Sequence, residues 1–338
     1  MTDVGIIGAS GFTGAELLRL CAQHPDLDVR LATGDTQAGT RAADLYPSLA
    51  AAQADLVFSA YDAAEVAGLD LVFLGLPHGA SQAIVPDLIG KVGHVVDLAA
   101  DFRLHDPAMY PRWYGAAHTV PELLGDFAYG LPELFRDEIR ATDHVATPGC
   151  YPTAAALALA PLVRAGAVET SGIIVDAASG VSGAGRPPQP STTFCAVDED
   201  FSAYGLLDHR HTPEMEQVLG ASVLFTPHLA PMSRGILATC YARPTGATST
   251  EALLDLQRVA YAAEPFVVVT DGSPSTKATL GSNCAHVTAR FDERTGWVLA
   301  IAAIDNLTKG ASGAAVQCAN LLLDLPETTG LPLAGLYP

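Results

Sequence analysis

The feature that most constrains the fold is a glycine-rich turn between two regular segments at the start of the chain. Residues 4–7 have the apolar character of a buried strand, and residues 15–20 have the pattern of a helix. Between them the chain reads Gly-Ala-Ser-Gly-Phe-Thr-Gly, with glycines at positions 8, 11 and 14. Such glycines let the backbone approach a pyrophosphate, whose charge the helix N-terminus stabilises. A tight turn needs glycine for steric reasons too, but the flanking strand and helix favour a dinucleotide site.

Strands and helices continue to alternate after this turn. This alternation indicates an α/β fold whose N-terminal part is a Rossmann-type, doubly wound parallel sheet. Ligands bind at the carboxyl ends of such strands, where His78, Asp101 and Arg103 lie. Asp101 and Arg103 could equally pair with each other. The further strands predicted here are residues 27–33, 69–76 and 92–98.

The segment after the second predicted strand bears on the choice of nicotinamide cofactor. An NAD enzyme places a carboxylate there to accept from the ribose, whereas an NADP enzyme needs donors for a phosphate. Thr33, Thr36 and Gln37 can donate, and Arg41 could reach a phosphate. Asp35 is the contrary sign, because its charge would repel that phosphate. We predict NADP, with Asp35 pointing to solvent.

Cys150 is the candidate nucleophile. It lies in the turn Thr-Pro-Gly-Cys-Tyr-Pro-Thr, which opens an Ala/Leu-rich run predicted to be a helix from Thr153 to Leu162. A thiol at a helix N-terminus is favoured as thiolate, and a thiolate that attacks an acyl group forms a thioester. The alternative is a small, buried and inert cysteine, which is the commoner fate of this residue type.

A second glycine-rich stretch, residues 178–188, follows a predicted strand at residues 172–178. We expect it to be an irregular loop at the active centre rather than a flexible linker. Its small residues expose backbone N–H groups that suit an anion, and Arg186 is a natural clamp for a phosphate or carboxylate.

The stretch Asp-His-Arg-His-Thr-Pro-Glu at residues 208–214 supplies the candidate acid/base group. Histidine exchanges protons near neutral pH, so His209 or His211 is expected to partner Cys150. Thr212 is predicted to cap a helix that begins at Pro213. Strands predicted at 222–226, 235–243, 286–292 and 297–305 indicate a mixed, largely antiparallel sheet, followed by a helix at 312–323.

Composition excludes several classes of protein. The net charge of −19 argues against nucleic acid and anionic membranes as partners, because both require clustered Lys and Arg. The six cysteines lie far apart and show no metal-binding spacing, so neither a zinc site nor a disulfide framework is expected. No apolar run is long enough to span a bilayer, and residues 1–3 lead directly into a strand. We therefore expect a soluble, cytoplasmic protein.

Taken together, five motifs resemble the N-acetyl-gamma-glutamyl-phosphate reductases, which are NADPH-dependent enzymes of arginine biosynthesis. The resemblance covers nearly the whole chain, and its specific parts are PGCYPT and HRHTPE. It implies a thioester on Cys150 and an acid/base role for His211, with His209 second. Phe12 departs from the tyrosine that is frequent in such turns. The motifs are GASGFTG at 8–14, PGCYPT at 148–153, SGVSGAGR at 179–186, HRHTPE at 209–214 and NLTKGASGAAVQ at 306–317.

The resemblance also implies the remaining site residues. The expected contacts to NADPH are Gly8, Ser10, Gly11, Phe12, Thr13, Gly14, Thr33, Thr36, Pro77, Ser179, Gly180 and Asn306. The expected contacts to the acyl phosphate substrate are Arg103, Ser182, Gly183, Arg186 and His209.

We expect two domains, one for the cofactor at residues 1–149 and one for catalysis and oligomerisation at residues 150–307. Residues 308–338 are expected to pack back on the first domain. A homodimer or homotetramer is the default for such an enzyme. Two other functions stay open, since fold alone does not fix function: a reductase of aspartyl or aminoadipyl phosphate, and a non-catalytic NADP sensor.

Overall fold

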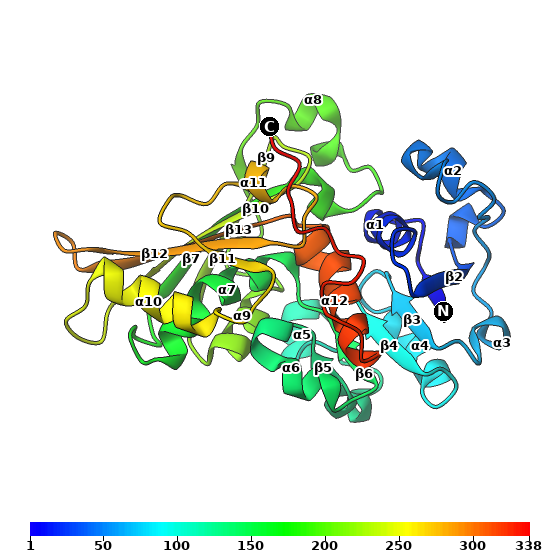
Figure 1. Ribbon diagram of the computed structural model, residues 1–338, viewed down its shortest axis with the longest axis horizontal. Helices are drawn as coiled ribbons and strands as arrows, with labels where there is room; N and C mark the ends of the chain where they lie inside the picture. Colours follow the sequence, from blue (N-terminus) through cyan, green and yellow to red (C-terminus); the bar gives the residue numbers. More distant parts are fainter. The chain divides into compact units, whose positions relative to one another are not determined.

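The computed structural model describes residues 1–338, and the chain folds into two compact units (Figure 1). The first unit comprises residues 1–148 and 311–331, and the second comprises residues 149–310 and 332–338. Of the C-terminal segment, residues 311–331 belong to the first unit and residues 308–310 and 332–338 to the second, whereas the sequence led us to expect all of 308–338 beside the first. The functional roles of the two regions stay predictions.

The first unit is built on a six-stranded sheet with the order β2-β1-β3-β4-β6-β5, in which every pair is parallel. This confirms the predicted doubly wound sheet. All four residues of β3 are fully buried, as expected for a parallel strand covered on both faces. The strands are β1 (Thr2–Ile7), β2 (Leu27–Ala32), β3 (Leu71–Leu74), β4 (His94–Asp97), β5 (Ala128–Tyr129) and β6 (His144–Ala146).

The helices of the first unit include one from the far end of the chain. Helix α12 packs against α1, α6 and β4, and its apolar residues are almost completely buried. Its Asn320 is buried as well, and it bonds His24 at 2.9 Å and the Thr329 carbonyl at 2.9 Å. The helices are α1 (Phe12–Cys21), α2 (Ala42–Leu45), α3 (Ala63–Val66), α4 (Ser81–Leu88), α5 (Met109–Tyr114), α6 (Pro132–Arg140) and α12 (Gly313–Leu322).

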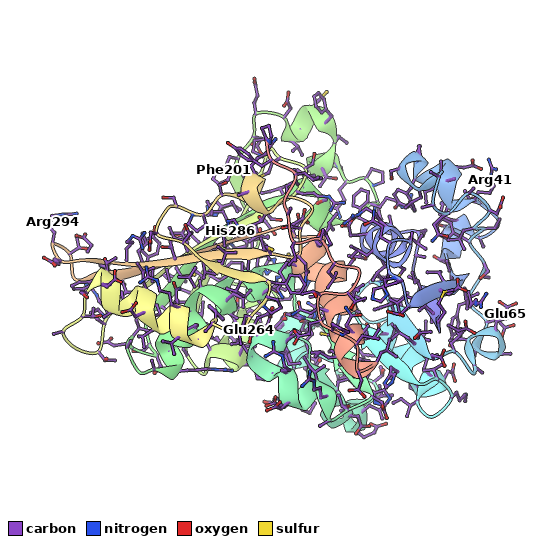
Figure 2. All side chains as sticks on the ribbon, viewed as in Figure 1. Arg41, Glu65, Phe201, Glu264, His286 and Arg294 are labelled. Atoms are coloured by element: carbon purple, nitrogen blue, oxygen red, sulfur yellow. The ribbon has the colours of Figure 1, made fainter.

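The second unit is built on a seven-stranded mixed sheet with the order β11-β12-β13-β10-β7-β9-β8. Two of its pairs, β11 with β12 and β7 with β9, are parallel and the other four are antiparallel, which confirms the predicted mixed, largely antiparallel sheet. The β12–β13 hairpin turns near Arg294 (Figure 2). The strands are β7 (Ile173–Gly180), β8 (Ser202–Ala203), β9 (Val223–Ala230), β10 (Ile236–Ala242), β11 (Val267–Val269), β12 (Ala285–Asp292) and β13 (Trp297–Ile304).

The three longest helices of the second unit cover one face of this sheet, and the other face is open around Ile174, Tyr241 and Leu299 of β7, β10 and β13. Helices α7, α9 and α10 lie along the same face (Figure 1). Along β10, Ile236, Ala238 and Cys240 are fully buried, while the residues between them are partly exposed on the other face. The core therefore lies between the sheet and α7. The helices are α7 (Cys150–Arg164), α8 (Phe194–Val197), α9 (Thr212–Leu219), α10 (Thr250–Ala260) and α11 (Thr276–Thr279).

Two local predictions are wrong. Residues 178–180 are not part of an irregular loop, because β7 continues to Gly180 and a 3₁₀ turn follows at Val181–Ala184. The bare backbone of Gly180 donates to the Gly235 carbonyl at 2.9 Å, which extends the strand pairing. Thr212 does not cap α9, because it is the first helical residue and His211 holds the N-cap position.

None of the helices combines the length and the hydropathy needed to cross a bilayer.

The glycine turn gives a stability prediction. A Cβ at Gly14 would lie 2.5 Å from the Ala9 carbonyl carbon, inside the packing of α1 on the end of β1. Gly14→Ala should therefore lower the free energy of unfolding by about 1–3 kcal/mol in urea denaturation, although alanine is the better helix former. Gly125→Ala is the matched control, because a Cβ there has no neighbour within 4 Å. Equal stability of both variants would contradict the close packing.

Candidate active site

Cys150 is the first residue of α7, with Gly149 as its N-cap. The Thr153 N–H and hydroxyl both bond the Gly149 carbonyl at 3.0 Å, which fixes the first turn. The amides of such a turn have no carbonyl partner inside the helix, and their dipoles favour a thiolate. The predicted helix thus begins three residues earlier than expected and includes the cysteine.

The other cysteines are poorly suited to nucleophilic chemistry. Four of them are buried, and burial raises the pKa of Cys21 to about 12 and that of Cys240 still further. Cys195 is exposed, but it lies in the four-residue helix α8. Only Cys150 combines partial exposure with the start of a long helix.

Two glycine backbones enclose Cys150. A Cβ at Gly149 would lie 2.7 Å from Cε1 of His211, so the imidazole rests directly against the residue before the cysteine. A Cβ at Gly310 would lie 2.8 Å from the Cys150 Cβ itself. Position 149 must therefore be glycine for the imidazole to approach, and position 310 for the chain to pass the cysteine.

Glu214 contacts the candidate site, and the sequence reasoning did not predict it as a site residue. It is fully buried in the first turn of α9, and its Oε1 accepts the Gly149 N–H at 2.8 Å. This bond ties the start of α9 to the start of α7. The signal was the Glu that ends the His-Arg-His-Thr-Pro-Glu motif, which is three residues after His211.

The two histidines of the motif occupy different environments. The His209 Nδ1 accepts the His211 N–H at 3.2 Å, and the two rings lie 4.8 Å apart. Burial, together with the positive charge of Arg210, lowers the pKa of His209 to about 4. His209 is therefore neutral at physiological pH and orients His211, whereas the His211 ring lies beside the cysteine turn.

Tyrosines line the same region. The Tyr151 hydroxyl donates to the His228 carbonyl at 2.9 Å and accepts from the Tyr204 hydroxyl at 3.1 Å. Burial raises the pKa of both phenols, that of Tyr204 to about 12. Both side chains stay protonated at neutral pH. The Tyr151 ring packs against His209 and His211, and the Tyr204 ring packs against His209.

The end of β7 gathers a group of predicted ligand-binding residues. The Asn306 Oδ1 accepts the Gly235 N–H at 2.7 Å, and its Nδ2 donates to the Ser182 hydroxyl at 2.9 Å. A Cβ at Gly183 would lie 2.8 Å from the Ser179 hydroxyl, and the Ser179 side chain interacts with Tyr151. The structure thus connects these residues to the neighbour of Cys150.

Arg186 follows this group in sequence, and one of its guanidinium donors is unpaired. Its Nε is buried and has no hydrogen-bond partner. A buried, unsatisfied guanidinium donor is costly unless a ligand supplies the acceptor. This donor suits an anion, and the assignment of Arg186 to ligand binding stays a prediction.

In the first unit the glycine turn has the geometry of a phosphate cradle. Gly8 has a φ of +84°, and a Cβ there would lie 2.5 Å from the Gly75 carbonyl oxygen. A Cβ at Gly11 would meet nothing nearer than 3.7 Å, so the backbone there is open to a ligand. Ser10 bonds the Gly34 carbonyl at 3.1 Å, which ties the turn to the end of β2. A dinucleotide cofactor fits this backbone.

The predicted residues around the end of β2 differ in burial and in their partners. Thr33 is 3 % exposed, and its hydroxyl accepts the Gly8 N–H at 3.1 Å, so it supports the glycine turn. Asp35 and Thr36 are exposed, and Asp35 thus lies in solvent as expected. Arg41 is paired with Asp44 at 2.7 Å.

The remaining predicted residues of this unit differ in exposure. Phe12 and Thr13 are half-buried at the start of α1, and Pro77 is exposed after β3. Arg103 is 7 % exposed and donates to the Leu98 carbonyl at 2.7 Å, so part of its guanidinium stabilises the loop after β4.

Comparison with known protein families identifies the family of the chain. Residues 3–142 match the family model described as semialdehyde dehydrogenase, NAD binding domain, and residues 150–306 match semialdehyde dehydrogenase, dimerisation domain. The chain therefore belongs to the semialdehyde dehydrogenase family.

Curated relatives narrow this class. The N-acetyl-gamma-glutamyl-phosphate reductase of Symbiobacterium thermophilum is 50% identical, with 99% of each chain covered. The enzyme of the same name from Alkalilimnicola ehrlichii is 46% identical, with 100% of each chain covered. Within the family the chain thus groups with the N-acetyl-gamma-glutamyl-phosphate reductases, and the resemblance seen in the motifs is confirmed.

Solved structures agree on the fold. Aspartate semialdehyde dehydrogenase II of Vibrio cholerae, complexed with ASA, gives a TM-score of 0.72 at 16% identity over 96% of this chain and 98% of that one. Aspartate semialdehyde dehydrogenase with NADP from Candida albicans gives 0.71 at 15% identity over 96% and 99%. At such identity the similarity concerns the fold alone.

The lowered pKa of His209 gives a prediction about stability and pH. The unfolded state binds a proton near pH 6.5 and the folded state only near pH 4, so His209 weakens the fold as the pH falls through this window. His209→Asn keeps an acceptor for the His211 N–H but cannot titrate. Between pH 7 and pH 4 the variant should therefore lose roughly 2 kcal/mol less free energy of unfolding than the wild type. Denaturant titrations at both pH values measure this difference, and parallel losses would contradict a neutral, buried His209.

Proposed function

We propose that the protein reduces N-acetyl-gamma-glutamyl phosphate to N-acetylglutamate semialdehyde with NADPH and releases phosphate, as a step of arginine biosynthesis. The names and full-length similarity of the curated relatives support this reaction. In the structure the observation that carries it is the cysteine at the start of α7, enclosed by Gly149 and Gly310 with His211 alongside.

The geometry suits acyl transfer through the thiol. The Cys150 thiolate attacks the acyl carbonyl carbon, the N–H groups of the first turn of α7 stabilise the oxyanion, and phosphate leaves. The product of this step is a thioester on Cys150. An acyl phosphate is already an activated electrophile, so a metal ion is not required for this attack.

His211 is the proposed acid/base group of the second half-reaction. NADPH, when bound, supplies the hydride that reduces the thioester. His211 donates a proton to the oxyanion of the tetrahedral adduct on Cys150 and takes it back as the carbon–sulfur bond breaks, so the semialdehyde leaves and Cys150 returns to the thiolate. His209 holds the His211 backbone, and Glu214 holds Gly149.

The two ligands are assigned to different residues. The open backbone of the glycine turn supports cofactor binding in the first unit, and Arg186, with its buried unpaired Nε, supports binding of the substrate's anionic group in the second. We also assign Ser182, Gly183 and Asn306 to the ligand-binding surface, because they lie together at the end of β7.

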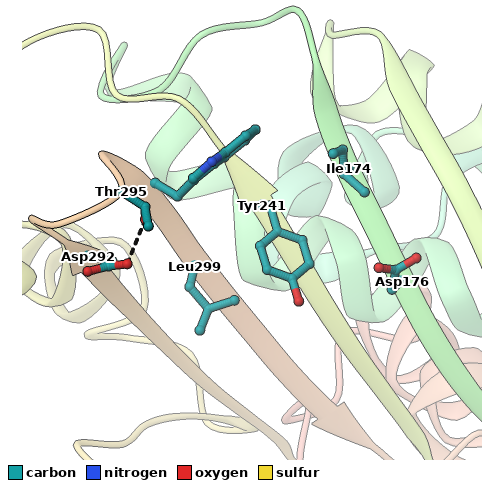
Figure 3. A pocket seen from close by; sticks show the side chains of 7 residues that line it. Ile174, Asp176, Tyr241, Asp292, Thr295 and Leu299 are labelled. Carbon is teal, nitrogen blue, oxygen red and sulfur yellow. Dashed lines mark hydrogen bonds between the residues drawn. The ribbon is translucent and has the colours of Figure 1, made fainter.

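A second copy of the chain is the proposed partner of the open sheet face. A hollow of about 410 Å³ lies on that face, with the side chains of Tyr241 and Leu299 on neighbouring strands and Asp176 beyond them (Figure 3). An uncovered, mostly apolar sheet face is costly in water, and symmetric dimers bury such faces. The description of the matching family as a dimerisation domain supports the same assignment. A cytoplasmic location stays a prediction.

An assay in the reverse direction tests the function. Wild-type protein with N-acetylglutamate semialdehyde, phosphate and NADP⁺ should produce NADPH, followed by its absorbance, and aspartate semialdehyde should support far less. Cys150→Ser should retain cofactor binding but lose nearly all turnover, at least about 10³-fold, because the nucleophile is gone. Activity with aspartate semialdehyde alone would favour the aspartyl phosphate alternative, and an active serine variant would refute the covalent route.

The two histidines are separated in the same assay. His211→Asn should lower kcat by about 10²–10⁴-fold with little change in cofactor affinity, because a proton acceptor is lost. His209→Asn should lower kcat much less, since asparagine can still accept the His211 N–H. The reverse ranking would show that His209 is the acid/base group.

The exposed position of Asp35 predicts the cofactor preference. The exposed Asp35 carboxylate can turn away from an NADPH phosphate, and the resembled reductases use NADPH. We expect kcat/KM for NADPH to exceed that for NADH by at least about tenfold, a difference of about 1.4 kcal/mol. A preference for NADH that disappears in Asp35→Asn would instead make Asp35 the ribose ligand.

A further inference from the structure

His78 and Asp101 form a pair that the reaction above does not use. They lie on the loops that follow β3 and β4, at the carboxyl edge of the parallel sheet. The His78 Nδ1 lies 2.5 Å from Oδ1 of Asp101, which is itself fully buried. A buried histidine–carboxylate pair at this edge is placed where a doubly wound sheet binds its ligand.

Asp101 holds three segments in place. Its carboxylate accepts the Gly79 N–H at 2.8 Å and the Gln82 N–H at 3.2 Å, so it organises the start of α4 as well as His78. Its carbonyl accepts from the Tyr110 hydroxyl and from the His118 ring. Burial opposes ionisation, but the bonds from His78 and Gly79 hold the pKa of Asp101 below its ordinary value. Asp101 is therefore a carboxylate, and it pairs with Nδ1 of His78, on which it holds the ring proton.

This arrangement leaves one edge of the His78 ring for a ligand. The Nδ1 atom is buried, and Tyr114 lies against the ring with a centroid distance of 4.2 Å. The side chain is nevertheless 21% exposed, so its accessible part is the remaining edge, which includes Nε2. With the proton on Nδ1, the Nε2 of a neutral imidazole is an acceptor.

The topology of the sheet indicates which part of a cofactor meets that edge. The loop after β3 touches the glycine turn, because a Cβ at Gly75 would lie 3.5 Å from both the Gly8 carbonyl oxygen and the Thr13 hydroxyl. In the order β2-β1-β3, the end of β2 is the side of the adenosine ribose and the end of β1 that of the diphosphate. The end of β3 is then the side of the second ribose, which carries the nicotinamide.

We propose that His78, oriented by Asp101, binds NADPH by accepting a hydrogen bond at Nε2 from a hydroxyl of the nicotinamide-side ribose. The inference rests on the proposed function only in its choice of cofactor. It gives the cofactor a side-chain contact on the side of the diphosphate opposite Thr33 and Asp35, and it assigns Asp101 a positioning role.

Two substitutions at position 78 separate ligand contact from support of the loop. His78→Asn places an amide donor near the position of Nδ1 and keeps the bond to Asp101, but it has no group at the position of Nε2. His78→Gln reaches the position of Nε2 with an amide that can accept. Asparagine should weaken NADPH binding about three- to tenfold, the value of one neutral hydrogen bond, whereas glutamine should bind within about twofold of the wild type.

The measurement is the Kd for NADPH, from quenching of protein fluorescence, beside the Kd for adenosine 2′,5′-bisphosphate. The second ligand lacks the nicotinamide-side ribose, so it should bind all variants equally. The matched control is His94→Asn, because His94 also pairs with a carboxylate, 3.2 Å from Asp143, but at the opposite end of β4. That variant should bind both ligands as the wild type does.

Three results would overturn the inference. They are unchanged NADPH binding in His78→Asn, equal weakening for both ligands, and a glutamine variant as weak as the asparagine variant. Failure of the wild type to bind NADPH at all would refute the proposed function instead, so the two failures are distinguishable. Thermal unfolding of each variant without ligand reports any general loss of structure.

Discussion

The arrangement of the candidate active site depends on the absence of side chains at Gly149 and Gly310. Any β-carbon at position 149 would collide with the His211 ring, and one at position 310 would collide with Cys150. The Gly149 N–H is in turn held by the buried carboxylate of Glu214. The position of the His211 ring beside the cysteine turn is therefore set by backbone packing between the starts of α7 and α9.

Much of this arrangement is visible in the sequence because its causes are local. The glycine turn, the apolar strands and the Pro-Gly break before Cys150 each act within a few residues, and they predicted the parallel sheet and the helix that carries the thiol. Glu214 was missed as a site residue because its partner lies 65 residues away in sequence. The roles of His209 and His211 could not be separated either, since only the fold buries one ring and places the other against Gly149.

The stretch from Asp305 to Ser312 shows a second limit of sequence reasoning. It is largely polar, yet Asp305, Thr308, Lys309 and Ser312 are all fully buried. The Asp305 carboxylate accepts hydrogen bonds from the N–H groups of Gly281, Leu307 and Thr308. These bonds offset part of the desolvation cost of burying its charge. A hydropathy pattern does not predict such burial, because the Gly281 N–H and the Arg234 guanidinium, 3.6 Å from the carboxylate, come from segments distant in sequence.

The division of the chain between its two units limits what proteolysis or truncation can separate. The backbone passes from one unit to the other after residues 148, 310 and 331, so neither unit is one continuous segment. A single proteolytic cut cannot release either unit whole, and any truncation from the C-terminus that extends past residue 332 removes part of both. Two of the three crossings, at Gly149 and Gly310, are the residues that enclose the thiol. Cleavage of the backbone at either site would cut a segment that packs around Cys150.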